Sequence, residues 1–114
     1  MLDTDGAYDP TTNKRFTVPT GGAGWYQCFF STGVDDIQSG DYVYARLYLN
    51  GSSMSYGIAM DWGSSSNNIV QANGSHMVYM DDGDYLELYV YHNEGTTEAT
   101  EQTRCYFGAF RLNI

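Results

Sequence analysis

The strongest constraint on the fold is the strict alternation of side chains along residues 42–49, YVYARLYL. One set of alternating positions is aliphatic, and the other carries tyrosines and one arginine: Val43, Ala45, Leu47 and Leu49 against Tyr42, Tyr44, Arg46 and Tyr48. A period of two is typical of a β-strand, because successive side chains point to opposite faces. The run ends at Asn50-Gly51, the strongest short signal for a hairpin turn. These residues therefore predict a hairpin with one aliphatic and one tyrosine-rich face.

Other segments also have the pattern of short strands. YLELYVYHN, residues 85–93, repeats the alternation with aliphatic residues on one face. Bulky residues occur on both faces of two other segments, GWYQCFF, which begins at Gly24, and the closing RCYFGAFRLNI. This pattern indicates strands that are covered on both sides. GSSSNNIVQANGS, residues 63–75, is polar apart from Ile69 and Val70 and predicts mostly loop. Many short strands without a helical period predict an all-β protein built as a two-sheet antiparallel sandwich.

Length and composition agree with this fold class. The 114 residues fit a single domain that spans 1–114 and can bury a core. With 13 Gly, 11 Tyr and only 2 Pro, the chain has the composition of strands joined by tight turns. Its apolar runs are too short for a membrane span, and Met1 leads into acidic residues rather than a signal sequence. We therefore expect a soluble chain.

The charge of the chain limits its partners. Five Lys and Arg stand against 14 Asp and Glu, which gives a formal net charge of -9. Such a chain repels a phosphate backbone and an anionic lipid surface, so we expect neither a nucleic acid nor a membrane as partner. The charge does not exclude cations, uncharged ligands such as glycans, or other protein surfaces as partners.

Two stretches have the carboxylates of a cation site. Asp3, Asp5 and Asp9 are spaced around Gly6, which is half of a calcium-loop pattern, and an Asp-rich turn, DDGD, follows at residues 81–84. Because only part of the loop pattern is present, we favour a turn over a calcium loop at the first stretch. At DDGD the carboxylates are expected to cap a tight turn. We expect no cofactor and no metal ligand set, and calcium is the one cation left open.

Catalysis has little support in the sequence. His76 and His92 are the general-base candidates at neutral pH, and no nucleophile motif accompanies either, so both are expected at strand ends or in loops. Residues 21–24, GGAG, could hold an anion but lack the helix and the Lys of a phosphate loop. Asn50 and Asn73 begin Asn-Gly-Ser triplets, which have meaning only for glycosylation in a eukaryotic secretory pathway. We expect a protein that is not an enzyme.

Four motifs, taken in order, resemble the C1q-like family, whose domains share the jelly roll of tumour necrosis factor. They are YDPTTNKRFTVP, GWYQCFF, DDGDYLEL and CYFGAFRL, and the resemblance runs from about Tyr8 to Leu112. The sequence departs from the family pattern at Asn13, which replaces a usual Gly, at an extra residue near Lys14, and in the longer turn of residues 21–24. The family's first strand, which precedes this stretch, has no counterpart. The resemblance implies a C1q-like jelly-roll sandwich.

Domains of the resembled family assemble as trimers, so a strand of the inner sheet faces its own core on one side and neighbouring subunits on the other. Carried over, the resemblance places one set of side chains inside the sandwich: Tyr26, Cys28, Phe30, Leu86, Leu88, Val90 and Phe107. It places another set toward the trimer axis: Gln27, Phe29, Tyr85, Glu87, Tyr89, Tyr91, Tyr106 and Phe110. So many exposed aromatic rings are rare on a soluble monomer, which favours the homotrimer.

The resemblance also implies that Cys28 and Cys105 are neighbours. Their strands lie side by side in that fold with both side chains facing the core, so the two thiols are expected to lie close together. Their spacing lacks the C-x-x-C pattern of a zinc or redox site. We expect free, buried thiols that behave as small apolar side chains.

The outer face of the predicted hairpin is the best candidate for binding. Aromatic rings with polar groups suit sugars, because the C–H faces of a sugar stack on rings while its hydroxyls pair with polar side chains. The candidate ligand residues are Trp62, Tyr42, Tyr44, Arg46 and Tyr48, with Ser64, Asn67 and Asn68 of the following loop. The alternative is that the tyrosines only pack across strands and stabilise the sheet. Trp62 is therefore the favoured residue.

These observations lead to one functional hypothesis and one alternative. The hypothesis is a non-enzymatic, trimeric recognition head, the C-terminal domain of a fibre or virion-surface protein, which binds a glycan or a protein receptor. The acidic, Tyr- and Ser-rich surface favours a bacteriophage or bacterial-surface member and a virion or extracellular location. The alternative is a structural cap that trimerises a fibre without binding a receptor. Glycan hydrolysis would need two facing carboxylates, which the sequence does not identify.

Overall fold

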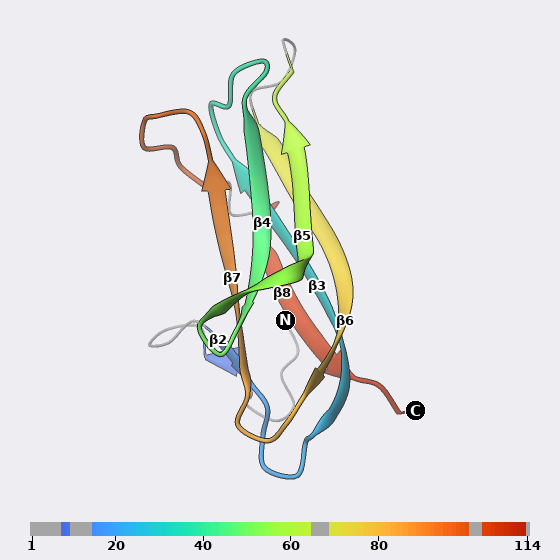
Figure 1. Ribbon diagram of the computed structural model, residues 1–114. Coiled ribbons are helices and arrows are strands. Elements are labelled where there is room, and N and C mark those ends of the chain that lie inside the picture. The colour runs from blue at the N-terminus through green and yellow to red at the C-terminus, as the bar shows by residue number, and fades with distance from the viewer. Residues whose placement is uncertain (1–7, 10–14, 65–68, 101–103, 114) are drawn as a thin grey trace.

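The computed structural model describes residues 8–9, 15–64, 69–100 and 104–113 (Figure 1). The secondary structure of this part of the chain consists of β-strands: Tyr8–Asp9 (β1), Arg15–Thr17 (β2), Gly24–Val34 (β3), Tyr42–Leu49 (β4), Ser52–Trp62 (β5), Val70–Met80 (β6), Tyr85–His92 (β7) and Tyr106–Arg111 (β8). Over these ranges, no helix has the length and apolar character needed to cross a membrane.

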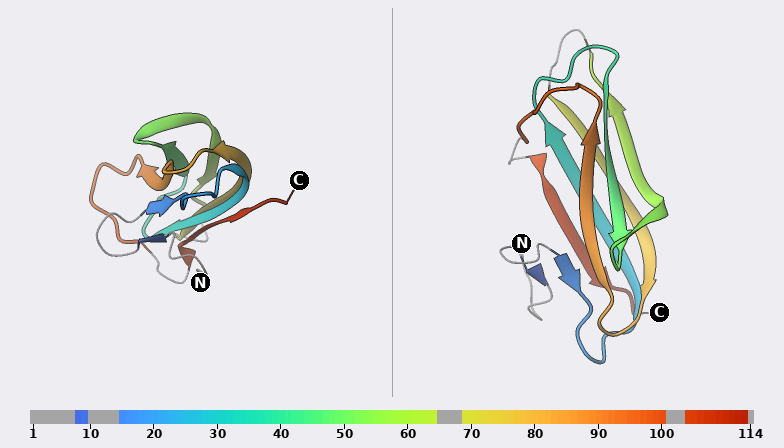
Figure 2. Two further views of the ribbon diagram at one scale, coloured as in Figure 1. Left: turned by 90° about the horizontal axis from the view of Figure 1, so that it is seen from below. Right: turned by 60° about the vertical axis from the view of Figure 1, so that its left-hand side comes forward.

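The strands form two antiparallel sheets. The large sheet has the order β1-β2-β7-β4-β5, and the small sheet has the order β6-β3-β8. Seen from two further directions, the sheets are two layers packed face to face (Figure 2). The predicted fold class, an all-β antiparallel sandwich of jelly-roll type, is confirmed.

The core between the sheets comes from alternate positions of their strands. Its buried side chains include Val43, Ala45 and Leu47 from β4, Leu86 from β7, and Tyr26, Cys28, Phe30 and Phe107 from the small sheet. Each of these lies at a position that the sequence predicted to point inward. Removal of this apolar surface from water is the main force that holds the two layers together.

Val90 departs from the predicted inward set because the sandwich is open beside it. Its neighbour across the sheet is the buried Ala45, so Val90 is on the inward side of β7, yet it is 40% exposed. β2 pairs with β7 only at Tyr85 and Leu86, so the outer edge of β7 is uncovered beyond Leu86 in the described part of the chain. Burial therefore falls along β7 from Leu86 through the half-buried Leu88 to Val90.

Asn50 and Gly51 form the turn of the predicted hairpin between β4 and β5. Both have positive φ, 52° at Asn50 and 82° at Gly51, as a two-residue hairpin turn requires. The Asn50 side chain also joins this turn to the start of β7. Its Nδ2 donates to Asp84 Oδ1 at 3.0 Å, and its Oδ1 accepts from the Tyr85 N–H at 3.0 Å. One side chain thus fixes two loops together at one end of the sandwich.

The prediction of a loop over residues 63–75 is wrong for its second half, because β6 begins within it and pairs with the full length of β3. Small residues suit this part of β6, since the Phe30 ring fills the space beneath it. A Cβ at Gly74 would lie 3.2 Å from Cζ of that ring. The polar Gln71 donates to Ser31 Oγ at 2.7 Å. Cross-strand pairing therefore makes a strand from a sequence that has the composition of a loop.

The two cysteines are free, as predicted, but they are not neighbours. Cys28 is fully buried opposite Ala109, and burial raises the pKa of its thiol to about 12. Cys105 is exposed and lies beside Gly33, whose N–H donates to Cys105 Sγ at 3.4 Å. Gly33 is further along β3 than Cys28 by about 17 Å at the usual rise per residue of a strand. The prediction of two adjacent, buried thiols is therefore wrong, because Cys105 precedes β8 and does not take part in its inward alternation.

The role of Asn50 can be tested by two substitutions. Asn50→Gly keeps the positive φ but removes both side-chain bonds, and should lower the free energy of unfolding by about 1–3 kcal/mol. Asn50→Ala also strains the backbone and should cost about 1 kcal/mol more. Denaturant titration followed by tryptophan fluorescence measures both changes, with the exposed Ser55→Ala on β5 as control. An unchanged midpoint in Asn50→Gly would mean that this side chain does not join the two loops.

Candidate functional site

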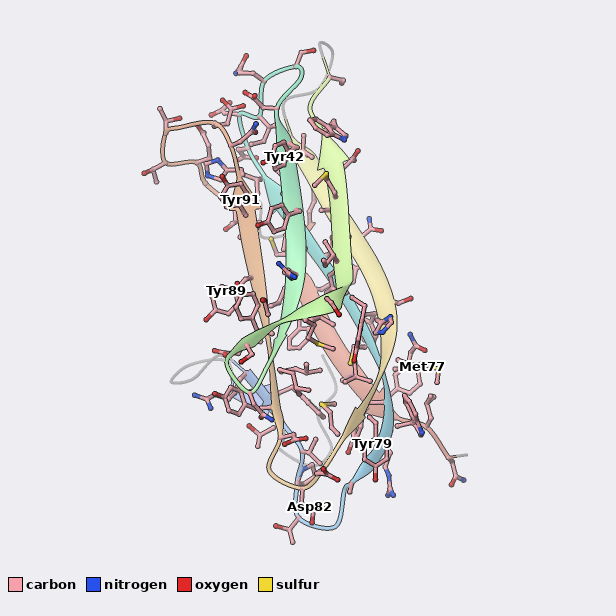
Figure 3. All side chains as sticks on the ribbon, viewed as in Figure 1. Tyr42, Met77, Tyr79, Asp82, Tyr89 and Tyr91 are labelled. Atoms are coloured by element: carbon pink, nitrogen blue, oxygen red, sulfur yellow. The ribbon has the colours of Figure 1, made fainter. Side chains whose placement is uncertain are left out.

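The outward side of the large sheet carries a row of aromatic and apolar side chains, which we term the tyrosine face. The register of β4 with β5 and β7 brings its members together: Tyr42, Tyr44, Arg46 and Tyr48 from β4, Ile58, Met60 and Trp62 from β5, and Tyr89 and Tyr91 from β7. The labelled Tyr42, Tyr89 and Tyr91 follow this row along the sheet (Figure 3). The predicted ligand residues of the hairpin thus share one surface.

Most rings of the tyrosine face pack on one another. Tyr48 and Tyr89 stack with their ring centroids 4.0 Å apart, and Tyr44 and Tyr91 stack at 5.0 Å. Stacking of this kind covers the flat sides of the rings and leaves their edges and hydroxyls available to solvent. Cross-strand packing, the alternative interpretation of the tyrosines, accounts for these two pairs.

Trp62 differs from these stacked pairs. It is the last residue of β5, is 55% exposed, and meets Tyr42 edge to face with 5.1 Å between the ring centroids. Met60 and Ile58, which lie on the same side of β5, are also exposed. This end of the tyrosine face therefore offers an accessible apolar surface that a flat ligand can cover.

Tyr42 supplies a hydroxyl beside that surface. Desolvation by its surroundings raises the pKa of Tyr42, and the phenols of Tyr91 and Tyr44 act in the same direction. A hydrogen bond with Tyr91 also contributes to the raised pKa, and the lone pairs of the Tyr42 hydroxyl oxygen can accept a hydrogen bond from a ligand.

Arg46 is the cationic member of the tyrosine face. Its side chain is half-buried, and its Nε donates to the Met54 carbonyl at 2.8 Å. Met54 lies where β5 bulges away from β4: the register shifts between Arg46 and Tyr48, and Gly57 has a φ of 73°. Arg46 therefore holds the irregular part of β5 against β4, from a position on β4 between Tyr44 and Tyr48.

The predicted ligand residues that follow β5 lie only partly within the described residues. Asn67 and Asn68 lie outside the described residues, whereas Ser64 is exposed just after β5. Sequence reasoning missed four members of the tyrosine face: Ile58, Met60, Tyr89 and Tyr91. The alternation of β7 contained a signal, because its tyrosines have the same period as those of β4. Only the pairing of the two strands shows that both rows are adjacent.

The outward side of the small sheet carries a second aromatic surface, which we term the uncharged face. Its large side chains are Trp25, Gln27 and Phe29 from β3, Met77 and Tyr79 from β6, and Tyr106 and Phe110 from β8. Met77 and Tyr79 project from β6, well away from the labelled tyrosines of the large sheet (Figure 3). No outward position of these three strands holds Asp, Glu, Lys or Arg. Sequence reasoning missed Trp25, Met77 and Tyr79 on this face.

Phe29 is at the centre of the uncharged face. Its ring lies against Gly108 of β8, where any Cβ would collide with it. Tyr106 and Phe110 lie on either side of this glycine along β8, with their ring centroids 6.3 and 6.4 Å from that of Phe29. The three rings therefore form one low, apolar platform, and the nearest charged side chain before β8 is Arg104, which lies over Gly33 at the edge of this face.

The predicted trimer residues divide between the two faces. Gln27, Phe29, Tyr106 and Phe110 belong to the uncharged face. Tyr85, Glu87, Tyr89 and Tyr91 are on β7 of the large sheet, beside the tyrosines of β4. The prediction that all of them point toward one axis is wrong, because the outward sides of the two sheets face in opposite directions. Alternation shows which residues share a side of a strand, but it does not show to which sheet that strand belongs.

The Asp-rich turn at residues 81–84 binds the protein's own backbone, and its Asp82 side chain is labelled in Figure 3. Asp82 accepts hydrogen bonds from the N–H groups of Gly21 at 2.8 Å and Ala23 at 2.9 Å. Asp84 accepts from the Asp81 N–H at 2.9 Å. The expectation that these carboxylates cap a tight turn is confirmed, and the anion held by the GGAG loop is the Asp82 side chain itself.

The surroundings of Asp82 favour its charged form. The Gly21 N–H and then the Ala23 N–H lower the pKa of this carboxyl, and the positive charge of Arg111 acts in the same direction. Arg111 also donates to the Ala23 carbonyl at 2.8 Å, so it closes the same loop from the other side. Over the described ranges, no group of three or more His, Cys, Asp or Glu is placed to hold a metal ion.

The other candidate sites do not converge on one place. Asp9 is in β1, which pairs with β2, whereas Asp3, Asp5 and Gly6 lie outside the described residues. His92 ends β7, as predicted, but His76 is inside β6, where its ring centroid is 4.5 Å from that of Tyr56. The two histidines are in different sheets and do not act as a pair.

No protein-family model matches the sequence, and no curated protein matches it significantly. The interpretation of both faces therefore depends on their residues and their geometry.

Asp82 should make stability depend on pH at the acidic end. Because its pKa in the folded protein is lower than the ordinary value of 3.8, its contribution to stability is present above that pH and is lost as the pH falls through the folded pKa. Asp82→Asn should therefore unfold at a lower denaturant concentration than the wild type at neutral pH, and the two midpoints should converge in acid. Asp81→Asn is the matched control, because it removes a neighbouring carboxylate that receives neither loop N–H. A difference that persists unchanged in acid would contradict this role.

Proposed function

We propose that this protein is a non-enzymatic, homotrimeric recognition head of the C1q-like type, the C-terminal domain of a fibre or virion-surface protein. The uncharged face joins the copies, and the tyrosine face binds a glycan or a protein receptor at a virion or extracellular surface. The observation that carries the proposal is the presence of two exposed aromatic faces on opposite sides of one small sandwich.

Self-association is assigned to the uncharged face because of the charge of the chain. Copies that each carry a net charge of -9 repel one another, so they can pack closely only where no acidic side chain is buried between them. The outward positions of β3, β6 and β8 meet that condition. Trp25, Phe29, Tyr106 and Phe110 are all between 37 and 52% exposed, an apolar patch that soluble monomers rarely leave open.

Recognition is assigned to the tyrosine face because it combines apolar and polar groups. Trp62 supplies an accessible ring, Tyr42 supplies a hydroxyl, and Arg46 supplies a charge. Large aromatic side chains with a polar tip are typical of surfaces that bind sugars and proteins. Three such faces on one trimer would raise a weak affinity per site through avidity.

The alternative is a structural trimerisation cap without a receptor. Its support is the stacking of Tyr48 on Tyr89 and of Tyr44 on Tyr91, which stabilises the large sheet without any ligand. Trp62, Met60 and Ile58 take part in neither stack, so the stacking does not explain why they are present on this face. Substitution of these residues therefore distinguishes a recognition head from a structural cap.

The assembly face can be tested with matched charge substitutions. Phe29→Asp should convert the trimer to a monomer, because it places a carboxylate in a desolvated apolar contact. Tyr89→Asp is the control, since it places the same charge on the tyrosine face and should leave the trimer intact. Size-exclusion chromatography with light scattering measures the mass of each variant. A wild-type protein that is a well-folded monomer at micromolar concentration would refute the assembly.

The recognition face can be tested with the two tryptophans. Trp62→Ala should abolish or strongly weaken binding on a glycan array or to a receptor-bearing cell, because the accessible ring is lost, and it should leave the trimer mass unchanged. Trp25→Ala on the uncharged face is the matched control and should weaken the trimer instead. Full binding by Trp62→Ala would mean that the ligand does not bind at this end of the tyrosine face, and binding of no ligand by the wild type would favour the structural cap.

A further inference from the structure

Arg46 is an unusual residue for its surroundings. Asp and Glu greatly outnumber Lys and Arg in this chain, yet an arginine lies in the middle of the tyrosine face. In the register of the large sheet its neighbours are Ile58 on one side and Tyr89 on the other, neither of which is a carboxylate. Within the described residues, Arg46 has a hydrogen bond to the Met54 carbonyl and no carboxylate at ion-pair distance.

The bond to Met54 explains only part of this side chain. It uses Nε and holds the bulge of β5, a purely structural task. A guanidinium has five N–H donors in a plane, so four donors on the two terminal nitrogens remain. With Nε fixed to the backbone, those terminal nitrogens are presented as a fork of fixed orientation. A fork of this kind matches the two oxygens of a carboxylate.

We propose that Arg46 binds the carboxylate of an acidic sugar in the receptor glycan, a proposal that rests on the assignment of the tyrosine face to glycan binding. The terminal nitrogens of Arg46 form a bidentate pair with the carboxylate. The sugar ring that carries it lies across the exposed edges of Tyr89 and Ile58, and the rest of the glycan reaches toward Trp62.

The charges of the face limit the ligand to isolated carboxylates. Glu87 is opposite Tyr48, one outward position along the sheet from the pair formed by Arg46 and Tyr89. A second negative charge on the ligand at that place would meet Glu87 as well as the net charge of the protein. Densely sulfated or phosphorylated chains are therefore excluded, whereas a glycan with one sialic or uronic acid among neutral sugars fits.

The first experiment is isothermal titration calorimetry of the wild-type protein with four probes: sialyllactose, sialyllactose methyl ester, trigalacturonic acid and lactose. An acidic probe should bind about ten- to hundredfold more tightly than lactose, the usual effect of a charge-assisted hydrogen-bonded pair. If it is sialyllactose, its methyl ester should bind like lactose, because the ester has no anionic oxygen for the fork. The two acidic probes show whether the carboxylate comes from a sialic or a uronic acid. This comparison needs no variant and does not depend on how substitutions affect folding.

The second experiment uses Arg46→Lys, with Arg15→Lys as the matched control on the same sheet. Lys keeps the positive charge but lacks the planar fork, so Arg46→Lys should lose most of the preference for the acidic probe and keep the affinity for lactose. Arg15, whose guanidinium lies 4.0 Å from the centroid of the Tyr85 ring, should be replaceable without effect on binding.

The outcomes separate this proposal from the function on which it rests. If lactose and both acidic probes bind equally, and Trp62→Ala weakens all of them, the tyrosine face binds glycans but Arg46 is not a carboxylate site. If no saccharide binds, the proposal for Arg46 is overturned and the face is left to a protein receptor. A preference for the acidic probe that survives in Arg46→Lys would also overturn it.

Discussion

Every strand of this protein has two sides, and a sandwich of two sheets can bury only one side of each. The aliphatic side of β4 and the inward side of β3 meet in the core, where Leu47, Phe30 and Cys28 are fully covered. Because β3 and β4 also carry aromatic rings on their outward sides, burial of the core necessarily leaves two aromatic faces exposed. Both the assembly and the recognition that we propose are consequences of that constraint.

The sequence predicted the structure correctly where that structure depends on residues close together in the chain. Alternation along residues 42–49 and the Asn50-Gly51 turn predicted the hairpin, and with it a surface that joins Tyr42, Tyr44, Arg46 and Tyr48. Predictions from the sequence were wrong where the structure depends on pairing between segments far apart in the chain. Tyr89 was expected on the trimer axis although its ring stacks on that of Tyr48, and β6 was hidden in a polar sequence that becomes a strand only beside β3. The residues of a strand do not by themselves show which of the two sheets the strand belongs to.

Charge is divided between the two faces in a way that composition alone does not reveal. The uncharged face excludes every acidic residue of a strongly acidic chain, whereas the tyrosine face keeps Arg46 at its centre. Acidic side chains elsewhere serve the backbone, as Asp82 does for the GGAG loop. An uncharged surface suits close contact between like-charged copies, and a fixed cation among aromatic rings suits a polar ligand.

The central claim is that the two aromatic faces have separate partners, and the two tryptophans report on them directly, since Trp25 is on the uncharged face and Trp62 on the tyrosine face. The measurement is acrylamide quenching of tryptophan fluorescence in the single-tryptophan variants Trp62→Phe and Trp25→Phe, over a range of protein concentrations. The account predicts that Trp25 is protected at high concentration and becomes quenchable on dilution, while Trp62 stays quenchable at every concentration until ligand is added. Equal quenching of both tryptophans at all concentrations, or protection of Trp62 by self-association, would contradict it.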